Sequence, residues 1–139
     1  MNFEEFRAFA EEKFDTDWTA TPVEWENVSE SDALIAVKNA KTPWVRFTIR
    51  DGDGNRQTIG SDSRLNRYAG SLIIQIFVAQ KTGTASARTY AAIIAAIWDG
   101  YAGEPCLEFG PADITVVGET EGWFQFNVTV PFLNDDLTS

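Results

Sequence analysis

The chain contains no histidine, and this absence removes the commonest general base and metal ligand. Its single cysteine, Cys106, has no histidine to activate it, and it cannot form a disulfide within the chain or a cysteine-based zinc site. We interpret Cys106 as a small buried hydrophobic residue, because free cysteine is among the most buried residue types. The sequence therefore predicts no catalytic residues, no metal site and no cofactor.

Basic residues are also scarce: the chain has 11 Lys and Arg but 21 Asp and Glu, which gives a net charge of −10. A protein that binds nucleic acid through phosphates needs a basic surface, and no cluster of Lys or Arg exists here. We therefore expect no specific nucleic-acid binding.

The longest dense apolar run, Tyr90–Trp98, is about half as long as a membrane-spanning helix, and the first residues lack the features of a signal peptide. We expect a soluble protein that makes no contact with membranes and resides in the cytoplasm.

Hydrophobic residues, in contrast, are plentiful: they make up 44% of the 139 residues and include five Trp, three Tyr and ten Phe. This content indicates a packed core and not a disordered chain. A chain of this length corresponds to one domain, which we place at residues 1–139.

The segment 71–98 predicts a strand followed by a helix that is apolar on nearly every side. Leu72, Ile74, Ile76 and Val78 alternate along residues 71–78, and residues 85–98 have a helical period. The helix puts one apolar face toward the core, with Trp98 at its centre. The opposite face consists of Arg88, Ala92, Ile93, Ala96 and Asp99. A helix that is apolar all round needs a second surface to cover it. We hypothesise that a neighbouring subunit covers this face; the alternative is that a loop, residues 15–27 or 102–110, covers it within one chain.

The remaining pattern predicts an α+β fold. Residues 2–14 form a helix in which Asn2 and Glu5 make a capping box and the apolar stripe includes Phe3 and Phe14. Strands follow at 44–50, 114–117 and 123–130, with a brief alternation at 23–25. Residues 33–37 fit either a strand or a helical turn. Pro131 is expected to end the last strand and to leave residues 134–139 as a frayed tail. Such alternation favours a single, mostly antiparallel sheet with helices on one face.

The segment 51–55, Asp-Gly-Asp-Gly-Asn, predicts a hairpin turn before residues 57–59. It also matches the start of a calcium loop, but Arg56 stands where that loop needs glycine and Asp62 stands where it needs glutamate. Asp51 and Asp53 could also be considered as a catalytic pair of carboxylates. However, aspartate is common in such a turn because it favours the turn geometry, so their presence does not indicate catalysis. We therefore expect neither a calcium site nor an enzyme.

Several blocks resemble the tail terminator-like proteins of long-tailed bacteriophages. The blocks are Thr21–Val28 (TPVEWENV), Trp44–Ile49 (WVRFTI), Tyr68–Phe77 (YAGSLIIQIF), Lys81–Thr84 (KTGT) before an alanine-rich helix, and Gly122–Phe132 (GWFQFNVTVPF). They lie in the same order as in that family and extend over roughly positions 20 to 132. The acidic segment 29–32 departs from the family pattern.

The resemblance implies a structural role in the virion tail at the head–tail junction, after assembly in the host cytoplasm. Family members form a ring, commonly a hexamer, on the last ring of the tail tube; they stop tube growth and present a surface to the head–tail connector protein. Their fold is a mixed sheet with two helices. The expected partners are other copies of the chain, the tail tube protein and the connector protein, with DNA passing through the ring. The alternatives are another phage neck or head–tail completion protein and, less in keeping with the pattern, a small-ligand binding module.

Overall fold

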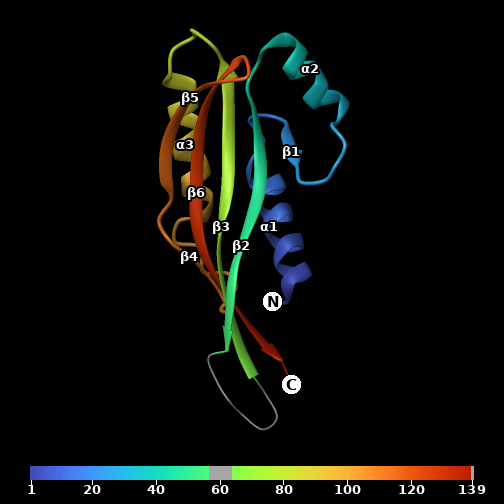
Figure 1. Cartoon of the computed structure of the whole chain (residues 1–139), viewed down its shortest axis with the longest axis vertical. Helices are drawn as coiled ribbons and strands as arrows, with labels where there is room; N and C mark the ends of the chain where they lie inside the picture. Colours follow the sequence, from blue (N-terminus) through green and yellow to red (C-terminus); the bar gives the residue numbers. More distant parts are fainter. Residues whose placement is uncertain (57–63, 139) are drawn as a thin grey trace.

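The computed structural model describes residues 1–56 and 64–138, which form a six-stranded sheet and three helices. Figure 1 shows these elements, which are α1 (Phe3–Asp17), β1 (Val23–Trp25), α2 (Asp32–Ala40), β2 (Trp44–Arg56), β3 (Arg64–Ala79), α3 (Ala85–Trp98), β4 (Leu107–Phe109), β5 (Asp113–Thr120) and β6 (Trp123–Thr138). The predicted α+β class with one mixed, mostly antiparallel sheet is confirmed. Helix α3 has the predicted bounds.

The sheet is built around the long strands β2, β3 and β6, which follow one another in space and are antiparallel. The short strand β1 adds to β2 in parallel, at the outer edge of the sheet. Strands β5 and β4 lie end to end along the free side of β6, opposite residues 123–129 and 132–134 respectively. In the upper part of the sheet as Figure 1 shows it, the two edge strands are therefore β1 on one side and β5 on the other.

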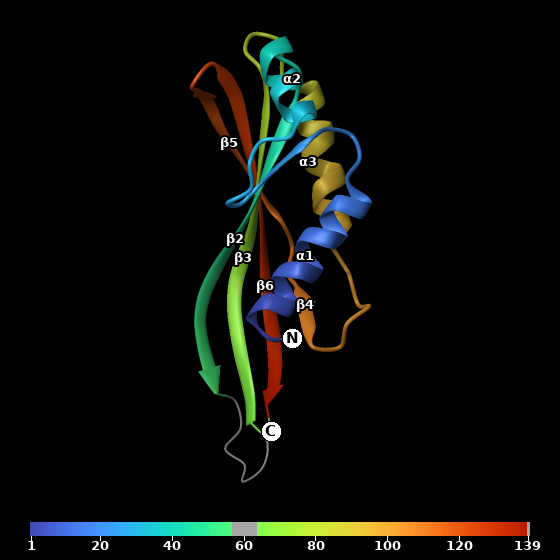
Figure 2. The ribbon, with the colours of Figure 1, turned by 90° about the vertical axis from the view of Figure 1, so that its right-hand side faces the viewer.

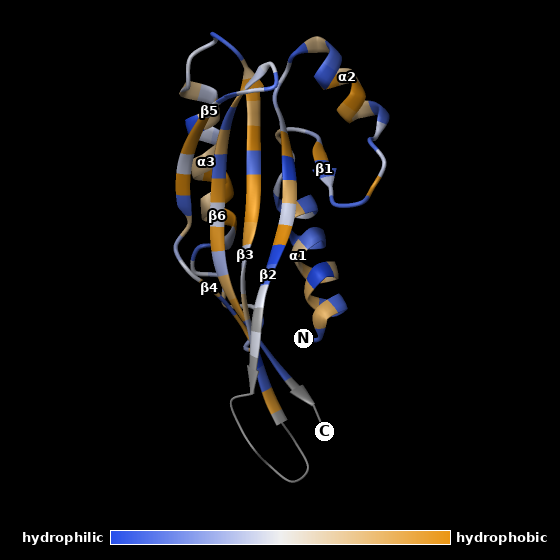
Figure 3. Ribbon diagram, viewed as in Figure 1, coloured by the Kyte–Doolittle hydropathy of each residue, from blue (hydrophilic) through white to orange (hydrophobic). Residues whose placement is uncertain are grey.

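One face of the sheet carries the main core, because alternate residues of the three long strands are apolar (Figure 3). Helices α1 and α3 cover this face side by side (Figure 2). They run in opposite directions, since Trp18 at the end of α1 packs on Tyr90 near the start of α3 and Phe9 packs on Tyr101 just beyond α3. Trp98 lies fully buried in this core, on the side of α3 that was predicted to face inward.

The opposite face is covered only at one end, by α2. Leu34 of this helix packs on Trp44, Phe77 and Trp123, which point away from the main core and form a separate small cluster. Ser31 caps α2 by accepting a hydrogen bond from the Leu34 amide at 3.1 Å. Residues 33–37, for which strand and helix were both open, are therefore helical. Three of the four large residues in this cluster come from strands.

Helix α1 begins as its capping residues predict. The Asn2 side chain accepts from the Glu5 amide at 2.8 Å, and the Glu5 carboxylate accepts from the Asn2 amide at 2.9 Å. The helix continues to Asp17, past the predicted end at Phe14. Phe3 was predicted to be in the core stripe, but its side chain is 72% exposed, because it lines an open hollow beside α1.

The prediction of a hairpin turn at residues 51–55 is wrong, because β2 continues to Arg56 and pairs with β3 down to Asn66. An irregularity between Asp51 and Gly54 keeps the strand paired. Tyr68 covers Gly54 so closely that a Cβ there would lie 2.6 Å from the tyrosine ring. The glycines therefore allow close approach across a strand pair, and do not make the turn. The connection predicted at residues 57–59 lies outside the described residues.

The prediction that Pro131 ends the last strand is also wrong, because β6 pairs with β3 as far as Thr138. The Pro131 carbonyl accepts a hydrogen bond from Gly110, between β4 and β5, so the missing N–H of Pro131 faces the gap between these two strands. The segment 134–138 is not a frayed tail. Asn134 is buried and exchanges hydrogen bonds with Met1, and Arg67 holds Asp135 through two hydrogen bonds.

Candidate functional site

Helix α3 has a buried side and an exposed side along its whole length. The chain turns at a glycine with positive φ just before the helix and again just after it; φ is 82° at Gly83 and 70° at Gly100. The helix therefore begins and ends abruptly. The buried side contributes Ala87, Ala91, Ile94 and Trp98 to the main core. Because residues 91–97 are all alanine or isoleucine, the sequence favours a helix that can pack closely on both sides.

The five residues predicted to form an interface, Arg88, Ala92, Ile93, Ala96 and Asp99, are all exposed in the single chain. Neither of the two loops that we considered as an intramolecular cover buries them. Four of the five lie toward β5, where Arg88 stacks 5.6 Å from the Phe126 ring centroid. Ile93 is 45% exposed and lies farther round the helix, toward α1. The structure therefore brings the predicted residues to one helix surface, with Ile93 at its margin.

A groove runs between α3 and the segment that enters β5. It is lined by Ala92, Ala95, Ala96 and Asp99 on the helix and by Pro111 and Ala112 opposite. Beyond the groove, β5 exposes Ile114, Val116 and Val117, each to between 46% and 48%. The outer side of β5 pairs with no other strand among residues 1–56 and 64–138. Sequence reasoning predicted the β5 strand but missed its place at an edge, which depends on pairing with β6.

The opposite side of the molecule has a second hollow, between α1 and the outer edge of β2. Its lining includes Phe3, Arg7, Glu26, Val28 and Ile49, together with Glu4, Phe6, Glu11, Asn27 and Asp51. The Glu26 carboxylate accepts a hydrogen bond from the Ile49 amide at 2.8 Å, two residues beyond the part of β2 that pairs with β1. Phe3 and Val28 are exposed to 72% and 57%. This flank therefore also presents apolar side chains to the outside.

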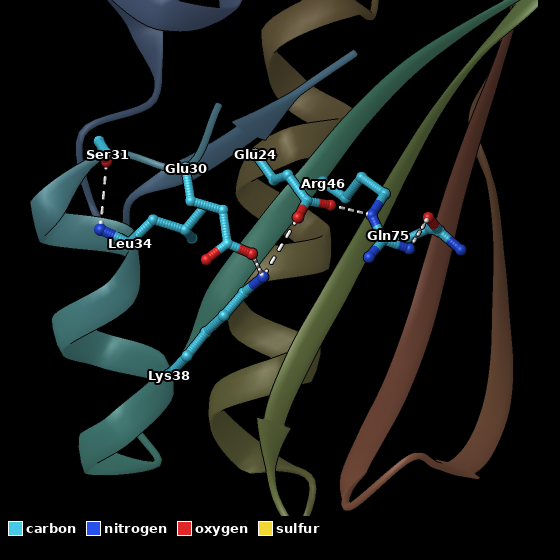
Figure 4. A network of polar contacts seen from close by, with 7 residues as sticks. All are labelled: Glu24, Glu30, Ser31, Leu34, Lys38, Arg46 and Gln75. Atoms are coloured by element: carbon cyan, nitrogen blue, oxygen red, sulfur yellow. Dashed lines mark hydrogen bonds and ion pairs between the residues drawn. The ribbon is translucent and has the colours of Figure 1, made fainter. Parts of the chain in front are cut away.

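A polar network lies on the sheet face that α2 partly covers (Figure 4). Lys38 of α2 contacts Glu24 at 3.1 Å and Glu30 at 2.6 Å, and Arg46 of β2 binds both Glu24 and Gln75. Partial burial raises the pKa of Glu24, but hydrogen bonds from Arg46 and Lys38 outweigh this effect and hold the pKa below its usual value. The network therefore ties β1 to both α2 and β2.

Two lysines of this region lie over tryptophan rings. The Lys38 Nζ atom is 4.1 Å from the Trp44 ring centroid, and Lys41 Nζ is 4.6 Å from that of Trp123. Such cation–π contacts stabilise the cluster beneath α2, in the case of Lys38 in addition to its ion pairs with Glu24 and Glu30. The cations in this part of the molecule therefore have structural partners.

Within the described ranges, no group of three or more His, Cys, Asp or Glu could hold a metal ion. Partial burial, and then the charge of Glu26, raise the pKa of Asp51, while the side chain of Asp53 and residue Asp62 lie outside the described part. No helix in residues 1–56 and 64–138 is long and apolar enough to cross a membrane. The arrangement as a whole offers exposed apolar flanks that can bind protein.

Comparison with known proteins agrees with this arrangement. A family model described as "Phage tail terminator protein" matches residues 5–102, which is more than half of the chain. One solved structure is similar over 100% of this chain and 99% of its own, with a TM-score of 0.67 and 16% sequence identity, and it shows that the fold is shared. None of the curated proteins is significantly similar in sequence.

Proposed function

Because the chain belongs to the phage tail terminator family, we propose that its copies form a ring, of six in the simplest case, that caps the tail tube. The ring stops the tube from growing and presents a surface to the head–tail connector. The family is structural, and the protein is a tail component of the virion that interacts with other phage tail or head proteins. Capping itself requires no catalysis, because a bound ring blocks the surface to which the next tube subunit would add.

The observation that carries the proposal is the exposed outer side of α3. A helix this apolar is expected to have both sides covered, yet Ala92 and Ala96 face an open groove beside an unpaired strand edge. Soluble proteins seldom leave such surfaces open unless they bind protein. Self-association would cover this side, in keeping with the sequence-based interface of Arg88, Ala92, Ile93, Ala96 and Asp99.

The net charge of −10 supports a ring through which DNA passes without binding. Phosphate groups bind basic surfaces, and an acidic or neutral channel wall would let the duplex slide. We expect no measurable binding to duplex DNA at physiological salt. A salt-sensitive, micromolar affinity for random duplex would contradict this expectation.

The test is Ala96→Glu, which places a charge in the proposed contact while the residue stays exposed in the single chain. The expected result is a monomer that stays folded, together with loss of ring formation and of tail capping, because an unpaired charge is costly in a buried contact. Light scattering across protein concentrations measures the mass of the particles, with and without purified tail tubes. Electron microscopy then shows whether tubes exceed their normal length.

Ala36→Glu on α2 is the matched control, since Ala36 is also an exposed alanine of a helix. We expect it to leave melting, mass and capping unchanged. A capping activity that survives Ala96→Glu would remove the outer side of α3 from the contact. A wild-type protein that stays monomeric at all concentrations, even with tubes present, would contradict the ring itself.

A further inference from the structure

The two edges of the sheet are level with one another. Strand β1 begins with Val23, which pairs with Val45; the register then passes through Ile76 and Phe126 to Val116 of β5. Following the neighbouring rows in the same way places Glu24 level with Thr115 and Trp25 level with Ile114. Each edge therefore offers three residues at the same height.

The directions of the two edge strands also fit. Strand β1 is parallel to β2, and each of the next three steps, to β3, β6 and β5, is antiparallel. Strand β5 therefore runs opposite to β1. If a second copy stands beside the first in the same orientation, its β1 can continue the sheet next to β5 as a normal antiparallel pair. A contact between two different edges can be repeated around a ring until it closes.

The side chains at the two edges are complementary on both faces. On the face of the main core, Val116 and Ile114 of β5, which are 48% and 46% exposed, would lie opposite Val23 and Trp25, which are partly buried. On the other face, Thr115 would lie opposite Glu24, whose charge is already paired with Lys38 and Arg46. At these three positions apolar residues therefore meet apolar residues, and the one charge among them, that of Glu24, is already paired.

The helices that flank the two edges also come together in this arrangement. Helix α1 lies beneath β1, where Phe14 packs on Trp25, and α3 lies beside the segment that enters β5. Placing copies side by side thus brings the exposed side of α3, with Ala92 and Ala96, toward the flank of the next copy on which Phe3 and Val28 are exposed.

We propose that β5 of one copy pairs antiparallel with β1 of the next copy, with Val116 opposite Val23 and Ile114 opposite Trp25. The sheets of neighbouring subunits would then be continuous, and α3 of one copy would pack beside α1 of the next. This inference rests on the proposed ring, but it specifies the two edges that join, which the ring alone does not.

The experiment uses cross-linking in a Cys106→Ser background, because Cys106 is the only cysteine. Light scattering first establishes that this background assembles like the natural protein. Val23→Cys and Val116→Cys are then introduced separately and together, and a short bis-maleimide reagent joins cysteines that lie close to each other. Ile35→Cys combined with Val116→Cys is the control pair, since Ile35 is an exposed residue of α2 that lies outside the proposed contact.

The double variant Val23→Cys/Val116→Cys should give a ladder of covalent oligomers that ends at the mass of the ring. Each single variant should give no covalent dimer, and an equal mixture of the two single variants should give dimers and no larger species. The control pair should give no ladder.

Three results would overturn the inference. Covalent dimers from Val116→Cys alone would show that two β5 strands pair with each other. Rings that form normally while the double variant gives no ladder would show that other edges join, and the proposed function would stand. Absence of any particle larger than a monomer would contradict the proposed function, and with it this inference.

Discussion

The two faces of the central sheet are built from the same strands but are stabilised very differently. The face beneath α1 and α3 belongs to a continuous cluster of buried hydrophobic residues that includes Phe47, Ile74 and Trp98. The buried hydrophobic cluster on the opposite face consists of Leu34, Trp44, Phe77 and Trp123, and beside it lies an ion-pair network (Figures 3 and 4). The hydrophobic driving force for folding is therefore concentrated on one face. The other face holds β1 and α2 through charges and aromatic rings.

The largest effect is expected from Trp98→Ala on the main face. Trp98 is fully buried and packs between Phe47 and Phe109, so truncation would remove about 3–5 kcal/mol from the free energy of unfolding. Chemical denaturation of the monomer measures this loss. Trp98→Phe is the control and should lose far less, because it retains a ring and removes an indole N–H that is buried without a partner. A loss below about 1 kcal/mol for Trp98→Ala would contradict the assignment of this face as the main source of stability.

A smaller loss is expected from Leu34→Ala on the opposite face. Leu34 is 1% exposed, but it belongs to a cluster of four buried residues, so we expect about 2 kcal/mol, at the low end for leucine truncation. The neighbouring Ile35→Ala, at a side chain 43% exposed, should change stability by less than about 0.5 kcal/mol. If Leu34→Ala lowers the free energy of unfolding as much as Trp98→Ala does, the two faces do not differ in their contribution to stability.

The smallest effect is expected from Glu24→Gln, which removes the central carboxylate of the ion-pair network. We expect a loss of up to about 1 kcal/mol near pH 7, since the Glu24 side chain remains 21% exposed and water screens its ion pairs. The sign of the pH dependence follows from the lowered pKa of Glu24 in the folded state. The stabilisation is fully present above the unfolded glutamate value of about 4.3, and it disappears as the pH falls through the lower folded pKa.

The measurement compares the unfolding free energy of Glu24→Gln with that of the natural protein from pH 7 down to pH 3. The difference between the two should shrink as the pH falls. Glu12→Gln on the exposed side of α1 is the matched control and should show no such trend. A difference that grows toward acid pH would mean that Glu24 destabilises the fold.

Local patterns in the sequence predicted the elements whose signals are contained within a few neighbouring residues. The capping box at Asn2 and Glu5, the bounds of α3 and the strand that contains Ile74 all follow from hydrogen bonds within one turn or from alternation along one strand. The helical period of α3 also predicted which residues share the side opposite the main core. These predictions succeeded because helical and strand periods determine which residues share a side, whatever the rest of the chain does.

Predictions failed where a residue type has a common local meaning that a distant strand overrides. Asp-Gly at residues 51–54 usually marks a turn, but pairing with Tyr68 and its neighbours keeps the segment extended. Pro131 usually ends a strand, but its missing N–H faces a gap between β4 and β5. In both cases the partner strand, and not the local sequence, determined the outcome.

The sequence by itself determined that this is a one-sheet α+β protein, with an alanine-rich helix that is apolar on both sides. Side-chain period and capping chemistry suffice for this, because they act between residues close along the chain. Only the tertiary structure decided that β1 and β5 are the edges of the sheet and that they lie at the same height. Their register depends on four successive strand pairings, between residues as far apart in sequence as Val23 and Val116, and no local pattern contains that information.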